Sequence, residues 1–97
     1  MKKAQLTQAE PLFQAIASLT TPLEVQLFLE DLCTPAEIEA MNDRWRVIPF
    51  ILDNIPYRQI HEETGVSVTT IGRVARCLHL GSGGYKLLAQ RLFKKDS

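Results

Sequence analysis

Apolar residues recur along most of this chain at steps of three and four positions, which is the spacing of one face of an α-helix. The longest such stretch covers residues 35–54 and is apolar on two sides, so we expect it to pack against partners on two sides. The pattern predicts an all-α fold without strands. The two apolar faces consist of Ile38, Met41, Trp45, Ile48, Leu52 and Ile55, and of Val47, Phe50 and Ile51.

Two threonine-proline pairs mark the starts of helices. In segments 21–24 and 34–37, threonine takes the N-cap position, proline the first helical position and glutamate the third. We expect each glutamate to accept a hydrogen bond from the backbone N–H of the capping threonine. These starts predict helices over 22–32 and 35–54, after a first helix that has Pro11 in its first turn and ends near Leu19.

Proline and glycine divide the second half of the chain. Pro49 lies inside the third helical pattern and predicts a kink or a break there, because it lacks a backbone N–H. Pro56 then ends this helix, since the residue before a proline disfavours the α conformation. Two short helices over 57–64 and 68–78 should follow, and a sixth and last helix should begin after a Ser82 cap. Tyr85, Leu88, Ala89 and Leu92 are predicted to share one face of this last helix.

Residues 57–78 have the spacing of a helix-turn-helix. Gly65 permits the positive φ angle that turns one helix sharply into the next, and Ser67 caps the second helix. His61 departs from the pattern, because many such motifs carry a small residue at this position. Val66 should fill the angle between the helices, and Ile60, Ile71 and Val74 should pack their crossing.

The outward face of the second helix in this motif carries residue types that read a DNA major groove. Arginine can form two hydrogen bonds with guanine, threonine offers a hydroxyl and a methyl group, and a helix N-terminus favours phosphate. The alternative interpretation is that the two helices merely pack, with these arginines on a solvated face. We predict DNA contacts from Arg58 and Gln59 in the first helix and from Ser67, Val68, Thr69, Thr70, Arg73 and Arg76 in the second.

The formal net charge of the 97 residues is zero, but the charges are unevenly distributed. Residues 1–41 hold two lysines and six carboxylates, a net charge of −4, whereas residues 42–97 hold nine lysines and arginines and five carboxylates, a net charge of +4. Phosphate contacts are therefore expected in the second part. The length suits a single helical domain, 1–97, and so short a chain often gains core by self-association, which predicts a homodimer.

Other functional classes find little support in the sequence. No stretch approaches the roughly 18 apolar residues of a membrane span, and the N-terminus lacks a signal peptide's apolar stretch, so we expect a cytoplasmic protein without membrane contact. Cys33 and Cys77 are interpreted as reduced thiols. Cys77 and His79 lack the second ligand pair that zinc needs, so no metal or cofactor is predicted. Without a glycine-rich phosphate loop or a nucleophile paired with a base, no enzyme is predicted.

Four segments of the chain resemble the Trp repressor superfamily, and within it the TrpR-like YerC/YecD branch. They are LCTPAE (32–37), RWRV (44–47), ETGVSVTTI (63–71) and RVARCL (73–78). The branch is favoured by DLCT at 31–34 and by Arg73 followed by RCL at 76–78. This resemblance implies a six-helix subunit in an intertwined dimer, which presents two helix-turn-helix units to successive major grooves about 34 Å apart.

The resemblance also implies a candidate effector pocket. Trp repressor holds the indole of its tryptophan corepressor between two arginines, which Arg44 and Arg73 match here, and Thr34 matches a further pocket residue. Where that pocket has a glycine and a serine, this chain has Val74 and Cys77, so a side chain should intrude and a polar partner is lost. We therefore expect no tryptophan corepressor. A different small-molecule effector, or a salt bridge or phosphate contact made by Arg44, stays open.

These observations predict a sequence-specific, DNA-binding transcriptional regulator that places its helix-turn-helix in the major groove as a homodimer, and by resemblance a repressor. The alternative is a helical protein-interaction module that has lost DNA binding, which the low net charge keeps open. Salt-dependent binding to duplex DNA distinguishes the two.

Overall fold

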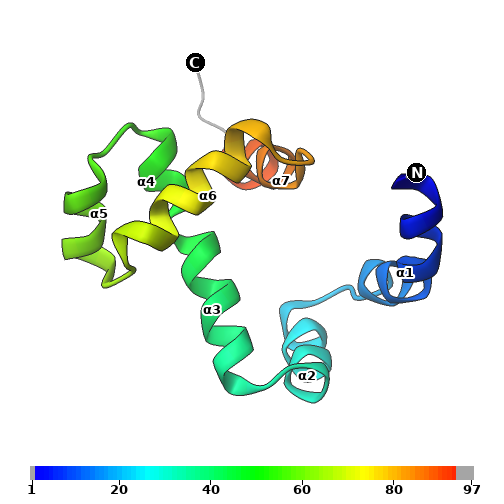
Figure 1. Ribbon diagram of the computed structural model, residues 1–97. Helices are drawn as coiled ribbons and strands as arrows, with labels where there is room; N and C mark the ends of the chain where they lie inside the picture. The colour runs from blue at the N-terminus through cyan, green and yellow to red at the C-terminus, as the bar shows by residue number, and fades with distance from the viewer. Residues whose placement is uncertain (1, 94–97) are drawn as a thin grey trace. The chain divides into compact units, whose positions relative to one another are not determined.

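The structure, a computed structural model, describes residues 2–93, with side chains from residue 8 onward (Figure 1). Within this range every regular element is helical, which confirms the predicted all-α fold. Seven helices follow one another along the chain: α1 (Lys2–Ala17), α2 (Pro22–Leu32), α3 (Pro35–Arg46), α4 (Ile48–Leu52), α5 (Tyr57–Thr64), α6 (Val68–Leu80) and α7 (Gly84–Leu92).

Inter-residue contacts divide the chain into two compact units, with the boundary after Ile38, inside α3. The first unit contains α1, α2 and the first turn of α3. The second contains the rest of α3 and the helices α4 to α7.

Of the two predicted capping boxes in the first unit, the one at Thr34 is complete and the one at Thr21 is half formed. Thr34 Oγ1 accepts a hydrogen bond from the backbone N–H of Glu37 at 3.1 Å, and Glu37 Oε1 accepts one from the backbone N–H of Thr34 at 2.8 Å. Thr21 Oγ1 likewise caps α2 by accepting from the backbone N–H of Glu24. These hydrogen bonds explain why α2 and α3 begin where the sequence predicts.

The carboxylate of Glu24 differs from the prediction, because its hydrogen bonds come from Thr20 and not from the capping residue. The backbone N–H of Thr20 donates to Glu24 Oε1 at 2.9 Å, and the Thr20 hydroxyl donates to the same oxygen at 3.1 Å. These two bonds hold the pKa of Glu24 below its ordinary value of 4.5, and the backbone bond has the larger effect. The glutamate thus ties the residue before the cap to the start of α2.

The start of α1 differs from the prediction. Pro11 was expected in the first turn, but α1 begins at Lys2, so Pro11 lies in the helix interior. The residues before it include lysine, alanine and glutamine, which are good helix formers, and their propensity extends the helix towards the N-terminus despite the backbone hydrogen bond that proline removes. The helix ends at Ala17, close to the predicted Leu19, where the Ser18 hydroxyl donates to the carbonyl oxygen of Ala15 at 2.7 Å.

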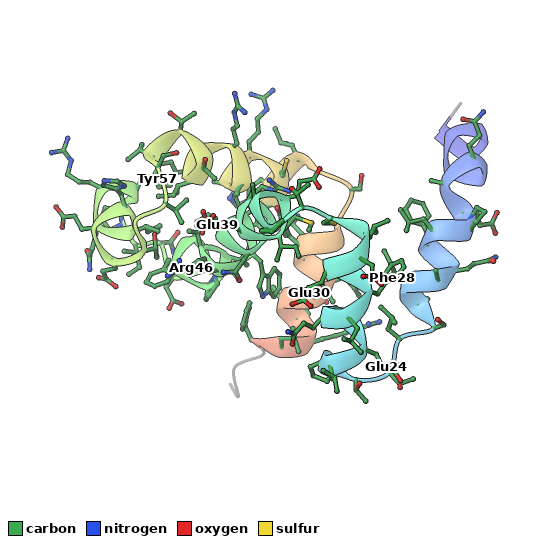
Figure 2. All side chains as sticks on the ribbon, turned by 90° about the horizontal axis from the view of Figure 1, so that it is seen from below. Glu24, Phe28, Glu30, Glu39, Arg46 and Tyr57 are labelled. Atoms are coloured by element: carbon green, nitrogen blue, oxygen red, sulfur yellow. The ribbon has the colours of Figure 1, made fainter. Side chains whose placement is uncertain are left out.

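The first unit buries none of its described side chains. Between residues 8 and 38 no residue is classed as buried, although α1 and α2 carry regularly spaced large apolar residues. Figure 2 shows the side chains of α2, including the labelled Phe28, projecting from this helix. The apolar faces of these helices are therefore available for a partner. Their exposed members are Leu12, Phe13, Ile16, Leu23, Val25, Leu27 and Leu32.

The third predicted helix is divided in two, as Pro49 led us to expect. A one-residue turn at Val47 separates α3 from α4, so Pro49 falls in the first turn of α4. A proline there removes no hydrogen bond from the helix, because the first backbone N–H groups of a helix have no partner within it. Asn54, with a φ angle of 60°, then ends this region shortly before Pro56. The break accounts for seven helices where six were expected.

The second unit has its own hydrophobic core. It is built from the fully or nearly fully buried apolar side chains of α4, α5, α6 and α7 together with the turns that join them. The indole of Trp45 stacks on the rings of Tyr85 and Phe93, with centroid distances of 6.4 and 5.3 Å, and so fastens α7 to α3. The core consists of Val47, Ile48, Ile51, Ile60, Val66, Ile71, Val74, Ala75, Leu78 and Ala89.

The predicted cap of the last helix is wrong. The α7 helix is preceded by Gly83 and not by a Ser82 cap, because Gly83 takes a left-handed conformation with a φ angle of 96°, which glycine adopts without steric cost. On the apolar face of α7, Ala89 is buried, Tyr85 is half-buried, and Leu88 and Leu92 are exposed. The α6 helix continues two residues beyond the predicted Leu78.

In the part of the chain that the structure describes, no helix is both long enough and apolar enough to cross a lipid bilayer.

Candidate nucleic-acid interface

At the residues predicted for the helix-turn-helix, the two helices α5 and α6 are joined by a three-residue turn (Figure 1). Gly65 ends α5 with a φ angle of 78°, and its backbone N–H donates to the carbonyl oxygen of His61 at 2.8 Å. Val66 is buried in the angle between the helices, as predicted. Ile60 of α5 and Ile71 of α6 are fully buried where the helices cross. The turn is therefore held by both backbone geometry and packing.

Two polar side chains of α5 brace this turn from within. His61 Nδ1 lies 2.8 Å from the carbonyl oxygen of Val66, and since a carbonyl only accepts, Nδ1 carries the proton in this contact. Thr64 Oγ1 donates to the carbonyl oxygen of Ile60 at 2.7 Å and accepts from the backbone N–H of Val66 at 3.1 Å. His61, which departs from the usual pattern, thus bridges the turn. No spacing rule predicts this contact from the sequence.

Ser67 caps the second helix, as expected. Its Oγ accepts a hydrogen bond from the backbone N–H of Thr70 at 3.1 Å and donates one to Thr70 Oγ1 at 3.0 Å. Ser67 is exposed and Thr70 is half-buried. Both hydroxyls therefore already serve the helix start, which fixes the position of the α6 tip.

The α6 helix has two opposite faces. One face packs into the core of the second unit through Ile71, Val74, Ala75 and Leu78, all of them buried. The opposite face, which we call the reading face, follows at steps of four, three and four residues and is exposed along its length. Val68, 47% exposed, lies at the helix tip. The reading face consists of Thr69, Arg73, Arg76 and Leu80.

The charge of α6 is entirely positive. The helix contains Arg73 and Arg76 and no aspartate or glutamate, and neither guanidinium pairs with a carboxylate among residues 2–93. Figure 2 shows long side chains ending in nitrogen that project outward from α6. Without a partner among the described residues, these cations are in the state in which they can meet phosphate or guanine.

The predicted residues of α5 lie at its exposed start. Arg58 and Gln59 are both exposed, and Gln59 Nε2 donates to Glu63 Oε2 one turn further on, at 2.9 Å. Pro56 precedes α5 without a side-chain cap, so within the described chain the backbone N–H groups of the first turn have no partner. The start of α5 is thus an uncapped helix N-terminus with an arginine beside it.

The four residues of the candidate effector pocket are distributed over both units. Thr34 belongs to the first unit, where its hydroxyl caps α3, whereas Arg44, Arg73 and Cys77 belong to the second unit and are exposed. Val74 is almost completely buried in the core of the second unit. Cys33 and Cys77 are free thiols.

A separate apolar groove of about 670 Å³ lies in the second unit between α4 and α7. Leu52, Leu87 and Phe93 form its apolar lining, and Lys86 and Arg91 add two positive charges. None of the predicted effector residues contributes to it. Leu52 and Leu87 are exposed, so in the single chain this groove is open to solvent.

Comparison with known proteins places the chain in one family. It is 36% identical to YerC of Bacillus subtilis (strain 168), described as uncharacterized, over 93% of this chain and 86% of YerC. The structure matches that of a TrpR-like protein from Eubacterium eligens with a TM-score of 0.87 and 37% identity over the whole of both chains. It matches a candidate Trp repressor from Staphylococcus aureus with a TM-score of 0.86 and 32% identity over 100% and 99% of the two chains.

These similarities confirm the predicted resemblance, including its YerC-like branch. The family model described as Trp repressor protein matches residues 7–93, which is most of the chain. The chain therefore belongs to the Trp repressor family.

Proposed function

We propose that the protein is a sequence-specific DNA-binding transcriptional regulator that inserts α6 into the major groove. The observation that carries this proposal is the division of α6 into a buried face and a reading face. Packing alone does not require the second face, which holds a threonine and two arginines that pair with no carboxylate within the described residues. Membership of the Trp repressor family supports a regulator and not an enzyme.

Each part of the motif has a distinct role in this proposal. Arg73 and Arg76 reach the base edges, with guanine as the base best suited to an arginine, and Thr69 offers a hydroxyl and a methyl group. Val68 at the tip offers an apolar contact for a thymine methyl group. Arg58 and the uncapped start of α5 contact the phosphate backbone and set the orientation of the motif.

The proposal includes a homodimer. The first unit exposes a set of large apolar residues on α1 and α2, and the second unit has an open apolar groove between α4 and α7. The net charges are complementary as well, because the acidic residues predominate before residue 42 and the basic residues after it. A second copy would bury these surfaces and present two reading faces to one duplex.

The remaining parts of the proposal concern the biological setting. Since its target is chromosomal DNA, we place the protein in the cytoplasm, and family membership favours repression over activation. Tryptophan is not its corepressor in this proposal, because Val74 and Cys77 replace the glycine and serine of the Trp repressor pocket. Calorimetry with L-tryptophan checks this point, and a clear heat with one ligand per subunit would contradict it.

Fluorescence anisotropy on a labelled duplex, selected from genomic fragments, tests DNA binding. The substitution Arg73→Ala should weaken binding to the selected duplex by about 1–3 kcal/mol and relax base preference, whereas Arg58→Ala should weaken binding to all duplexes alike and lower the salt slope by about one. Arg46→Ala is the matched control. It removes the same charge from α3, where Arg46 faces Asp43 at 3.7 Å.

The alternative function makes the opposite prediction. If the wild-type chain shows no salt-dependent binding to any duplex at low salt, the protein-interaction module is the better account. If binding occurs but Arg46→Ala weakens it as much as Arg73→Ala does, the reading face is wrongly placed.

A further inference from the structure

Gly72 leaves a gap on α6 between its buried face and its reading face, and the ring of Tyr57 lies over that gap. Tyr57 is the first residue of α5, and its Cε2 atom lies 3.9 Å from the position that a Cβ atom on residue 72 would take. Figure 2 labels Tyr57 where the start of α5 comes close to α6. The aromatic ring is therefore held against the DNA-reading helix, although it belongs to the preceding one.

The position of Cε2 also locates the hydroxyl group. Cε2 is bonded to Cζ, the ring carbon that carries the hydroxyl, so the hydroxyl-bearing end of the ring is the end near Gly72, which precedes Arg73 of the reading face. Tyr57 is 42% exposed, and among residues 2–93 its hydroxyl makes no hydrogen bond. A tyrosine that packs its ring and leaves its hydroxyl unpaired at a basic surface has a donor available for a ligand.

We propose that the Tyr57 hydroxyl donates a hydrogen bond to a DNA phosphate at the edge of the groove that α6 enters. This inference rests on the proposed DNA-binding function and adds a residue that the sequence pattern did not indicate. Phosphate is the expected acceptor because Tyr57 stands at the start of α5, next to Arg58, and tyrosine is among the residues that contact the backbone in protein–DNA complexes.

The contact is preorganised by the fold. Because one edge of the ring already lies against α6 at Gly72, part of the side-chain freedom that binding would remove is already restricted. It also couples the two helices of the motif, since the distance from the reading face to this phosphate donor is set by the contact between Tyr57 and Gly72. A side chain larger than alanine at position 72 would push the ring away.

A neutral hydroxyl leaves a distinctive thermodynamic signature. Lysine and arginine contacts release counterions, so their removal lowers the slope of log K against log salt concentration. The tyrosine hydroxyl carries no charge, so its loss should weaken binding without changing that slope. Since a phosphate carries no sequence information, the loss should also be the same for every duplex.

The substitution Tyr57→Phe tests the proposal, because it removes the hydroxyl and keeps the ring on Gly72. Binding of the full-length chain to a selected duplex and to an unrelated one is measured by fluorescence anisotropy over a salt series. We expect Kd to rise about 10-fold or more on both duplexes, as for the loss of a hydrogen bond to a charged group, with an unchanged salt slope and an unchanged unfolding temperature. Tyr85→Phe, which removes a hydroxyl from the stack on Trp45, is the matched control and should leave Kd unchanged.

The other outcomes are decisive in different ways. Equal Kd values for the wild type and Tyr57→Phe would overturn the phosphate contact and leave the DNA-binding function intact. A loss confined to the selected duplex would also overturn it, because the hydroxyl would then be reading a base. Absence of duplex binding by the wild-type chain would overturn the inference together with the proposed function.

Discussion

The two units of this chain differ in whether they bury their apolar side chains. The second unit gathers all ten apolar residues that are buried in the described part of the chain into a core that α4 to α7 share. The first unit, although it carries large apolar residues at helical spacing, buries none of its described side chains. The apolar pattern is equally regular in both halves, so regular spacing alone does not tell whether a helix packs within its own chain.

This difference has a functional meaning. The helix-turn-helix lies in the unit with its own core, so the reading face of α6 has a fixed support. The exposed apolar helices lie in the other unit, where burial requires a partner. In the proposed dimer, the second unit reads DNA and the first unit contributes the association surface. The following predictions test this division from the largest expected effect to the smallest.

The largest effect is expected from removing a core side chain of the second unit. Ile71→Ala should destabilise the fold by about 2–5 kcal/mol, because Ile71 is fully buried between α5 and α6 and the substitution leaves a cavity. Denaturant unfolding measures the loss. Val68→Ala, in the same helix but 47% exposed, is the control and should change stability by less than about 0.5 kcal/mol. Similar losses for both variants would contradict the two-faced description of α6.

A smaller effect, of a different kind, is expected in the first unit. Phe13→Ser should weaken self-association by about 1–2 kcal/mol, because Phe13 is an exposed aromatic residue of α1 that a second copy would bury. Sedimentation equilibrium measures the dimer dissociation constant. Gln14→Ser, at the next position of the same helix, is the control and should leave it unchanged. A wild-type chain that stays monomeric at high concentration would refute the assigned role of the first unit.

Two glycines of the second unit should respond in opposite directions to the same substitution. Gly65→Ala should destabilise the protein by about 1–2 kcal/mol, because its φ angle of 78° is unfavourable for a residue with a Cβ atom. Gly72→Ala should stabilise it by about 0.5–1 kcal/mol, since the methyl group meets only the Tyr57 ring at an ordinary 3.9 Å and alanine favours helix. Thermal unfolding compares the two variants. If both substitutions changed the stability in the same direction, the described turn would be contradicted.

The smallest effect concerns the cap of α2. Because the hydrogen bonds from Thr20 lower the pKa of Glu24 in the folded state, its charged form contributes stability above pH 4.5, and this contribution is lost as the pH falls through the lower folded-state pKa. Glu24→Gln should therefore lower Tm slightly at pH 7 and hardly at all in acid. Thermal unfolding of both chains at pH 7 and pH 3 measures this. A constant difference in Tm would show that the charge of Glu24 has no role.

Local signals in the sequence predicted much of the fold. The capping threonines, Pro49 and Gly65 act through hydrogen bonds and backbone angles within a few residues, and the helix boundaries near them were predicted closely. The helix starts predicted from Pro11 and Ser82 were wrong, because neighbouring residues with stronger conformational preferences determine where these helices begin. The exposure of Leu88 and Leu92 on α7 was not predictable, since it depends on which surfaces a single chain leaves uncovered.

The same distinction applies to the candidate interface. Arg73, Arg76 and Thr69 follow from helical spacing once the turn at Gly65 is recognised, and the structure leaves all three exposed, although their DNA contacts stay a prediction. Contacts across the motif were not visible in the sequence. The Tyr57 ring against Gly72 depends on the crossing of α5 over α6, which residue spacing does not specify.

Selection of bound fragments from random duplex DNA tests the central claim most directly, because it requires both a reading face and a second copy. We predict enrichment of an inverted repeat whose half-sites are centred about 10 base pairs apart, one helical turn, matching two symmetry-related helix-turn-helix units. An Arg73→Ala chain should lose this enrichment. Failure of the wild-type chain to enrich any sequence, or enrichment of a single half-site without a repeat, would contradict the account.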